Sequence, residues 1–256
     1  MSIRSLLRAS TLAVVVTTSA HAQQPVVSQP GASDARPTIA VLYFTNGALV
    51  PGTDYGPLSK GMAEMLITEI SRNPGVRVVE RDRLQQLLAE QNLGSGDRVD
   101  KETAVKLGKI LGAHHLLMGS FVIDPKLAMR IDVRSVNTET SQVEYVETVE
   151  GKADNMLTMV SQLGAKVNTG LKLPNIPMRV PGTPGGAVGA INRVSSTKID
   201  QLRAVMMMST ALEAQDRGDV PAAIALYKQA IDADPGFERP KVLLASLENG
   251  QKKPTP

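Results

Sequence analysis

The chain of 256 residues contains no cysteine and no tryptophan, and aromatic residues make up only 3% of it. Without cysteine there can be no disulfide, no thiolate nucleophile and no Cys-ligated metal. The scarcity of aromatic rings leaves little material for a surface that stacks on single-stranded nucleic acid. These absences exclude sulfur chemistry and argue against nucleic acid as a partner.

An excess of positive charge is also missing. The formal charge of +3 includes Arg4 and Arg8, which lie in a segment that we expect to be removed, and 28 − 2 = 26 bases against 25 acids leaves +1. A protein that binds the phosphate backbone needs a basic field. The hydrophobic content of 42% is sufficient for one or two globular domains.

The first 22 residues have the pattern of a secretory signal peptide. Arg4 and Arg8 form the charged region, residues 9–19 form a short apolar stretch, and Ala20-His21-Ala22 fits the cleavage pattern. A short membrane anchor is the alternative, but the stretch is below the roughly 20 apolar residues that a spanning helix needs. We expect an exported protein of the periplasm, or one associated with the outer membrane. Since it has no cysteine, we do not expect a lipoprotein.

The pattern of apolar residues predicts an α/β (α+β) domain with a mixed sheet over residues 37–173, after a disordered leader at 23–36. Strand-like runs and helical periodicities follow one another in the order β-α-β-α-α-β-β-β-α. The strands are expected at 38–44, 76–79, 115–122, 127–136 and 142–150, and the helices at 58–70, 84–91, 100–111 and 156–167.

A Pro- and Gly-rich segment at 174–198 predicts a linker, and residues 199–249 predict a small all-α helical hairpin with a further short helix.

The stretches Val78-Val79-Glu80-Arg81-Asp82-Arg83-Leu84, Gly108-Lys109-Ile110-Leu111-Gly112-Ala113 and Gly119-Ser120 occur in the α/β domain. Together they resemble the CsgG/HfaB family, which includes curli production assembly and transport components. The resemblance covers most of residues 38–171 and extends to Arg130-Ile131-Asp132-Val133-Arg134. The positions that carry the resemblance are charged residues just before the expected helix at 84–91, and glycines in or after the expected helix at 100–111 and in the expected strand at 115–122. We assign a structural role to Glu80, Arg81, Leu84, Gly108, Gly112 and Gly119.

Two departures separate this chain from the pore-forming members of that family. Those members are acylated on a cysteine and carry long insertions, whereas here only residues 123–126 separate the third and fourth strands. The strands at 127–136 and 142–149 could themselves form a membrane-inserted hairpin, but Glu144 and Glu147 fall on opposite faces of the second strand. We therefore favour a solvated sheet face.

The carboxy-terminal unit resembles a tetratricopeptide repeat. Small residues, one large residue and a proline fall at that repeat's spacings, and Met207 stands where a bulkier aromatic is common. A single repeat cannot bury its own apolar face, so the hairpin must pack on the α/β domain, on a copy of itself or on a partner. The residues for this packing or for partner contact are Met207, Ala211, Gly218, Ala223, Tyr227, Ala230 and Pro235.

We find no catalytic motif, and we expect no cofactor and no metal. His114 and His115 are adjacent in a strand and point to opposite faces, so they cannot chelate one ion. The charged run at 80–83 is interpreted as a solvated, partly salt-bridged turn. No nucleophile elbow, phosphate-binding loop or HExxH helix is present.

These observations favour a non-enzymatic, CsgG-like component of envelope assembly or secretion that acts by protein–protein binding. The expected partners are other envelope proteins or another copy of the chain, with peripheral membrane contact at most. The alternative is a soluble regulator of peptidoglycan synthases or of other envelope machinery. A hydrolase with a site built from scattered residues is a third hypothesis.

Overall fold

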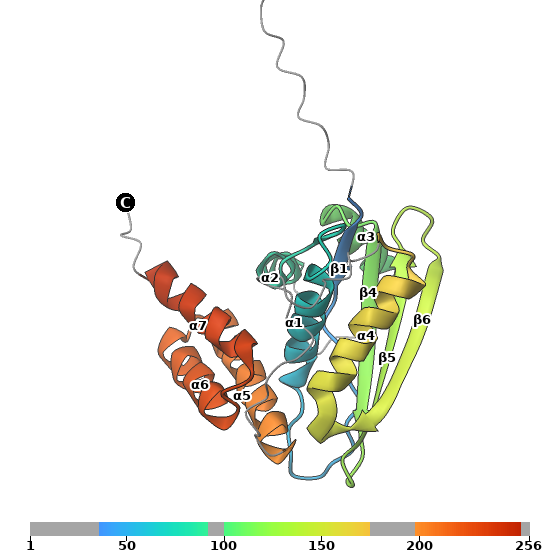
Figure 1. The fold of residues 1–256 in the computed structure, drawn as a ribbon. Helices are drawn as coiled ribbons and strands as arrows, with labels where there is room; N and C mark the ends of the chain where they lie inside the picture. The colour runs from blue at the N-terminus through green and yellow to red at the C-terminus, as the bar shows by residue number, and fades with distance from the viewer. Residues whose placement is uncertain (1–35, 92–99, 175–197, 252–256) are drawn as a thin grey trace, which may run out of the picture. The chain divides into compact units, whose positions relative to one another are not determined.

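A computed structural model describes residues 36–91, 100–174 and 198–251 of the chain (Figure 1). The strands are β1 (Thr38–Val41), β2 (Thr45–Asn46), β3 (Arg77–Val78), β4 (His115–Ile123), β5 (Ala128–Asn137) and β6 (Val143–Lys152). The helices are α1 (Leu58–Ser71), α2 (Arg81–Glu90), α3 (Lys101–Ile110), α4 (Met156–Gly170), α5 (Lys198–Asp216), α6 (Val220–Ala233) and α7 (Glu238–Gln251). A short 3-10 turn, η1 (Ala153–Asn155), precedes α4.

The strands form one mixed sheet in the order β3-β1-β4-β5-β6, with β2 also paired to β4. β1 is parallel to both β3 and β4, while β4, β5 and β6 form an antiparallel meander. Parallel neighbours need a crossover connection, which α1 provides between β1 and β3. The meander uses only short turns between its strands.

Apolar residues are buried on both faces of this sheet. Helices α1 and α4 cover one face (Figure 1), where they pack on Ile131, Val133 and the other apolar residues of β5 that share that side. Helices α2 and α3 cover part of the opposite face, over Leu116 and Val136. At the ends of β4, β5 and β6 that lie farthest from Leu116 and Val136, no described helix covers this second face.

Helix α1 is buried almost all around because it has the sheet on one side, α4 on another and α5 on a third. The apolar side of α5, including Ala204, Val205 and Met208, continues the core that α1 forms with the sheet. The carboxy-terminal helices are therefore packed on the α/β layers.

Local sequence explains several of the boundaries. The carboxylate of Asp100 accepts hydrogen bonds from the amides of Glu102 and Thr103, which caps the start of α3 as its sequence predicts. After α3 the chain turns at Gly112 with φ of +65°, a conformation that glycine adopts without steric cost.

The predicted fold class, a mixed-sheet α/β domain followed by helices, is confirmed. The two-residue strand β2 was not predicted. The apolar side of β5 lies under α1 and α4, while Arg130 and Arg134 on its other side are exposed, in keeping with the expected solvated sheet face.

The signal peptide, the leader and most of the linker lie outside the described residues, and the division into domains stays a prediction. Within the described residues, no helix combines the length and the apolar character that a membrane crossing requires.

Candidate functional site

Five ionisable side chains meet where the carboxy-terminal helices pack on α1 and α2. Lys60 and Glu64 come from α1, Arg81 from α2, Asp216 from the end of α5, and Arg239 from α7. We call this set the ionic cluster. It joins segments of the chain that are up to 175 residues apart.

Each carboxylate of the ionic cluster binds two cations. Asp216 accepts hydrogen bonds from Lys60 Nζ at 2.6 Å and from Arg81 Nη1 at 2.8 Å. Glu64 lies 3.5 Å from Arg81 Nε and accepts a hydrogen bond from Arg239 Nε at 2.6 Å. Arg81 therefore bridges the two acids, and its Nη2 also donates to the exposed Asp82.

These groups are removed from water. The side chains of Glu64, Arg81 and Asp216 are 2%, 3% and 7% exposed. A buried charge is costly to desolvate, so it is stable only when it is paired and hydrogen-bonded. The ionic cluster meets this condition, but it does so only when α5 and α7 are docked on α1 and α2.

Tyr43 lies next to the ionic cluster. Lys60 Nζ lies 5.6 Å from the centre of its ring, and its hydroxyl donates to Gln85 at 2.8 Å. Burial raises the pKa of Tyr43 above its usual range. Burial acts to lower the pKa of Arg81, but the carboxylate of Asp216 and its other neighbours outweigh that effect and raise it. Both groups keep their ordinary protonation state.

The structure corrects the interpretation of the run at 80–83 as a solvated, partly salt-bridged turn at one residue, Arg81. Glu80, Asp82 and Arg83 are exposed, but Arg81 points into the interior. Arg81 is the first helical residue of α2, and its side chain extends toward α1 and α5, where it pairs with two carboxylates.

The other motif positions of the α/β part occupy tightly packed places. Leu84 is buried under the sheet with α3. A Cβ at Gly108 would lie 2.6 Å from Thr138 Cγ2, and one at Gly119 would lie 2.3 Å from Phe44 Cε1. Gly112 supports the turn described above.

The repeat-like positions lie along the contact between α5 and α6. Ala211, Ala223, Tyr227 and Ala230 are buried, and the Tyr227 hydroxyl donates to Gln215 at 2.8 Å. Burial raises the pKa of Tyr227 above its usual range.

Three further positions of this set are less enclosed. Met207 is half-buried, Gly218 forms the turn between the helices with φ of +79°, and Pro235 is exposed beyond the end of α6. Small residues thus allow the two helices to approach each other. The assignment to a repeat family stays a prediction.

The two adjacent histidines at the start of β4, His114 just before it and His115 as its first residue, have separate environments. His114 Nδ1 accepts a hydrogen bond from the Thr38 amide, and His115 Nδ1 lies 2.6 Å from Glu144 Oε1. Over residues 36–91, 100–174 and 198–251, no three His, Asp or Glu side chains are grouped closely enough to hold a metal ion.

A second candidate surface is the part of the sheet that α2 and α3 leave uncovered. The register places Val122, Arg130 and Glu150 side by side across β4, β5 and β6. Val122 is 39% exposed and Val146 is 63% exposed on the same face. We call this surface the open sheet face. It presents apolar side chains among charged ones.

The sequence interpretation missed four members of the ionic cluster: Lys60, Glu64, Asp216 and Arg239. One signal was available. Lys60 and Glu64 stand four residues apart within the otherwise apolar run of α1, on a helix whose whole circumference is rich in small and apolar residues. Such charges must either be solvated or meet partners, but their partners lie too far along the chain to be identified by spacing.

Comparison with known families supports the resemblance. Residues 20–123 match the family described as curli production assembly/transport component CsgG. We refer to residues 20–123 as the CsgG-family region because they match that family. It contains Glu80, Arg81, Leu84 and the glycines at 108, 112 and 119, whereas the similar stretch at 130–134 lies beyond the match.

Several solved structures similar to this chain have low sequence identity to it. The LpoB C-terminal domain from Salmonella enterica is 14% identical, with 45% of this chain and 82% of that chain covered and a TM-score of 0.38. Lipoprotein GNA1162 from Neisseria meningitidis is 13% identical, with 52% and 99% covered and a TM-score of 0.38. The PelC dodecamer from Paraburkholderia phytofirmans is 12% identical, with 55% and 90% covered and a TM-score of 0.32.

At these values the similarity supports no statement about activity or partners. None of the curated proteins matches this chain.

Proposed function

We propose that this protein is a non-enzymatic component of cell-envelope assembly or secretion that acts in the periplasm, or in association with the outer membrane, by binding other proteins. The observation that carries the proposal is the match of residues 20–123 to the CsgG family. The signal-peptide pattern of residues 1–22 supports the location.

Two features of the structure support a binding role. The acids and bases of the ionic cluster are paired with one another, so this cluster stabilises packing and offers no free nucleophile–base pair. The open sheet face presents Val122 and Val146 among charged side chains. A rigid sheet with an uncovered face suits the docking of another protein.

The test is to identify the partners of the chain in the cell that carries it. The full chain with a carboxy-terminal tag is cross-linked in intact cells, purified from the envelope fraction under denaturing conditions and analysed by mass spectrometry. An unrelated exported protein with the same tag is the control.

We expect cross-links to proteins that export or assemble envelope or surface material. Cross-links confined to a peptidoglycan synthase would instead support the alternative role as a regulator. Recovery of the tagged chain in the cytosol, or no cross-linked protein beyond those of the control, would contradict the proposal.

A further inference from the structure

The outer edge of β6 is open. β6 pairs with β5 along its length, and no other described strand pairs with it. An edge strand presents unpaired backbone N–H and C=O groups to which a further strand can bind. β6 has ten residues, contains no proline, and has its one irregularity near its first end, at the bulge opposite Ser135 and Val136. Most of the edge is therefore regular.

The hydrogen-bond pattern identifies the backbone groups that face outward. The Ala153 amide donates to the Leu127 carbonyl at 2.9 Å, so this pair is hydrogen-bonded. Hydrogen-bonded and non-hydrogen-bonded pairs alternate in an antiparallel ladder. The N–H and C=O groups of Val146, Thr148 and Glu150 consequently point away from β5. In agreement, the Thr148 amide donates to the carboxylate of Glu147, at 3.2 Å, and not to β5.

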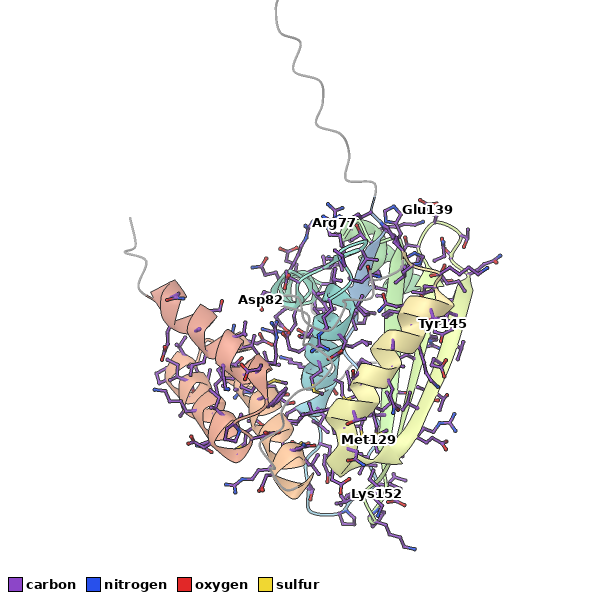
Figure 2. The ribbon with its side chains drawn as sticks, viewed as in Figure 1. Arg77, Asp82, Met129, Glu139, Tyr145 and Lys152 are labelled. Atoms are coloured by element: carbon purple, nitrogen blue, oxygen red, sulfur yellow. The ribbon has the colours of Figure 1, made fainter. Side chains whose placement is uncertain are left out.

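Side-chain surfaces flank this edge on both sides of the sheet. On the α4 side a shallow depression is lined by Tyr145, Glu147, Ala165, Lys166, Thr169 and Gly170. On the other side Val143 and Val146 are 46% and 63% exposed. Figure 2 shows the positions of Tyr145 and Lys152 towards opposite ends of β6. Alternate side chains of an added strand would contact the depression and the valines in turn.

The charge of the edge favours a basic occupant. β6 carries Glu144, Glu147 and Glu150 but only one cation, Lys152. Lys166 of α4 pairs with Glu147, whereas Glu150 is 67% exposed and lies 3.4 Å from Arg130, whose shorter hydrogen bonds go to Asp132. A second copy of β6 would bring the same excess of negative charge, and like charges on paired strands are destabilising. An extended segment with lysine or arginine side chains would complement it.

We propose that the outer edge of β6 is a strand-addition site that binds an extended segment, bearing lysine or arginine, of another protein. Backbone hydrogen bonds to the N–H and C=O groups of Val146 and Glu150 and to the C=O group of Thr148 hold the segment, and the two flanking surfaces select its side chains. The proposal deepens the proposed function, on which it rests, by naming the surface and the kind of segment that it binds.

The direct test is binding of a synthetic peptide to the purified chain without its signal peptide. The probe is a fluorescent peptide as long as β6 in which valine and threonine alternate with lysine. One matched control peptide has glutamate in place of each lysine. A second has N-methyl groups on alternate amides, which removes its backbone donors. We expect binding of the lysine peptide, with NMR shift changes in the amides of β6, and about tenfold weaker binding of each control.

A pair of variants locates the site on the protein. Val146→Pro removes an outward N–H that β5 does not use, and proline is tolerated at such edge positions. Val146→Thr keeps that N–H and a branched side chain, so it is the matched control. We expect about tenfold weaker peptide binding for Val146→Pro and unchanged binding for Val146→Thr.

Several results would overturn the proposal. These are equal binding of the three peptides, NMR shift changes away from β6, or self-association of the chain through β6 in place of peptide binding. If Val146→Pro does not fold, the comparison with the N-methylated peptide still decides. Because these tests use only the purified chain, their failure would leave the cross-linking result of the proposed function intact.

Discussion

Glu64 is the residue on which the ionic cluster depends most, because its buried carboxylate pairs with two arginines from different helices. Glu64→Gln removes that charge and leaves Arg81 and Arg239 short of a partner. Breaking a buried ion pair from one side costs about 3–5 kcal/mol, so we expect a loss of unfolding free energy of about that size in a urea titration.

The matched control for Glu64→Gln is Arg217→Gln. The Arg217 side chain is 65% exposed and lies 4.0 Å from Glu213. Exposed pairs contribute about 0–1 kcal/mol, so the control is expected to change stability by less than that. Equal effects of the two variants would show that the ionic cluster does not stabilise the fold.

Gly119 tests the packing of β4 on Phe44. A methyl group there would lie 2.3 Å from Phe44 Cε1, and this ring is only 1% exposed. We expect Gly119→Ala to cost about 1–3 kcal/mol, since the ring must be displaced within a filled core. Gly250→Ala, in α7 with nothing near its Cβ, is the control and should stabilise by up to about 1 kcal/mol. Chemical denaturation compares the two.

The carboxylate of Glu147, at the edge of β6, makes the stability of the fold depend on pH. The Tyr145 hydroxyl and the Lys166 ammonium donate hydrogen bonds to its carboxylate and lower the pKa of Glu147. A carboxylate whose pKa is lower in the folded state stabilises the fold at pH values above its ordinary pKa of about 4.3. This stabilisation is lost as the pH falls through the pKa of the folded state.

Thermal unfolding between pH 3 and pH 7, a range chosen around that value, measures the effect. We expect Glu147→Gln to be less stable than the unsubstituted chain near neutral pH, and the difference to shrink as the pH falls below about 4. Glu150→Gln is the control, because that carboxylate is 67% exposed and its distance to Arg130 is 3.4 Å. A difference that stays constant with pH would exclude the carboxylate as its cause.

At the scale of elements, docking of α5–α7 on α1 and α2 is the arrangement most open to experiment. Asp216 at the end of α5 binds Lys60 and Arg81. We expect Asp216→Asn to speed amide hydrogen exchange in α5, α6 and α7 by about tenfold or more, and to leave β4 and β5 unchanged, because local opening exposes only the undocked helices.

The control for this experiment is Asp219→Asn, since asparagine caps a helix as well as aspartate does, and Asp219 caps α6. Faster exchange throughout the chain in Asp216→Asn would show that the helices and the sheet open as one cooperative unit. Unchanged exchange would show that Asp216 does not hold the docked state.

Elements with local signals were predictable from the sequence. The alternation of Met129, Ile131 and Val133 predicted β5, and Asp100 predicted the start of α3, because each pattern depends on neighbouring residues. β2 has two residues and is defined by its pairing to β4, so it left no pattern of its own.

The ionic cluster was not predictable for a related reason. Arg81 is adjacent to other charged residues, and its neighbours in space lie on α1 and α5, which only the folded chain brings together. The family motif, which contains Glu80 and Arg81, thus marked one part of the candidate site in the sequence. The contacts of Arg81 with side chains of other helices could not be predicted from it.

At the scale of the whole molecule, the sheet is covered by α1 and α4 on one face and is partly open on the other, with the carboxy-terminal helices packed against α1. We interpret this arrangement as a rigid platform whose uncovered surfaces, the open sheet face and the outer edge of β6, are available to partners. The CsgG-family region supplies β1–β4 and α1–α3 of this platform, and the role that we propose for the chain is assembly or secretion at the envelope.

That role is tested most directly by deleting the gene for this chain in the cell that carries it and measuring the amount of envelope and surface material that is exported to the cell surface. We predict that deletion lowers the exported amount, that the intact chain restores it, and that the Val146→Pro chain restores it poorly although it accumulates normally. Unchanged export after deletion would contradict the account.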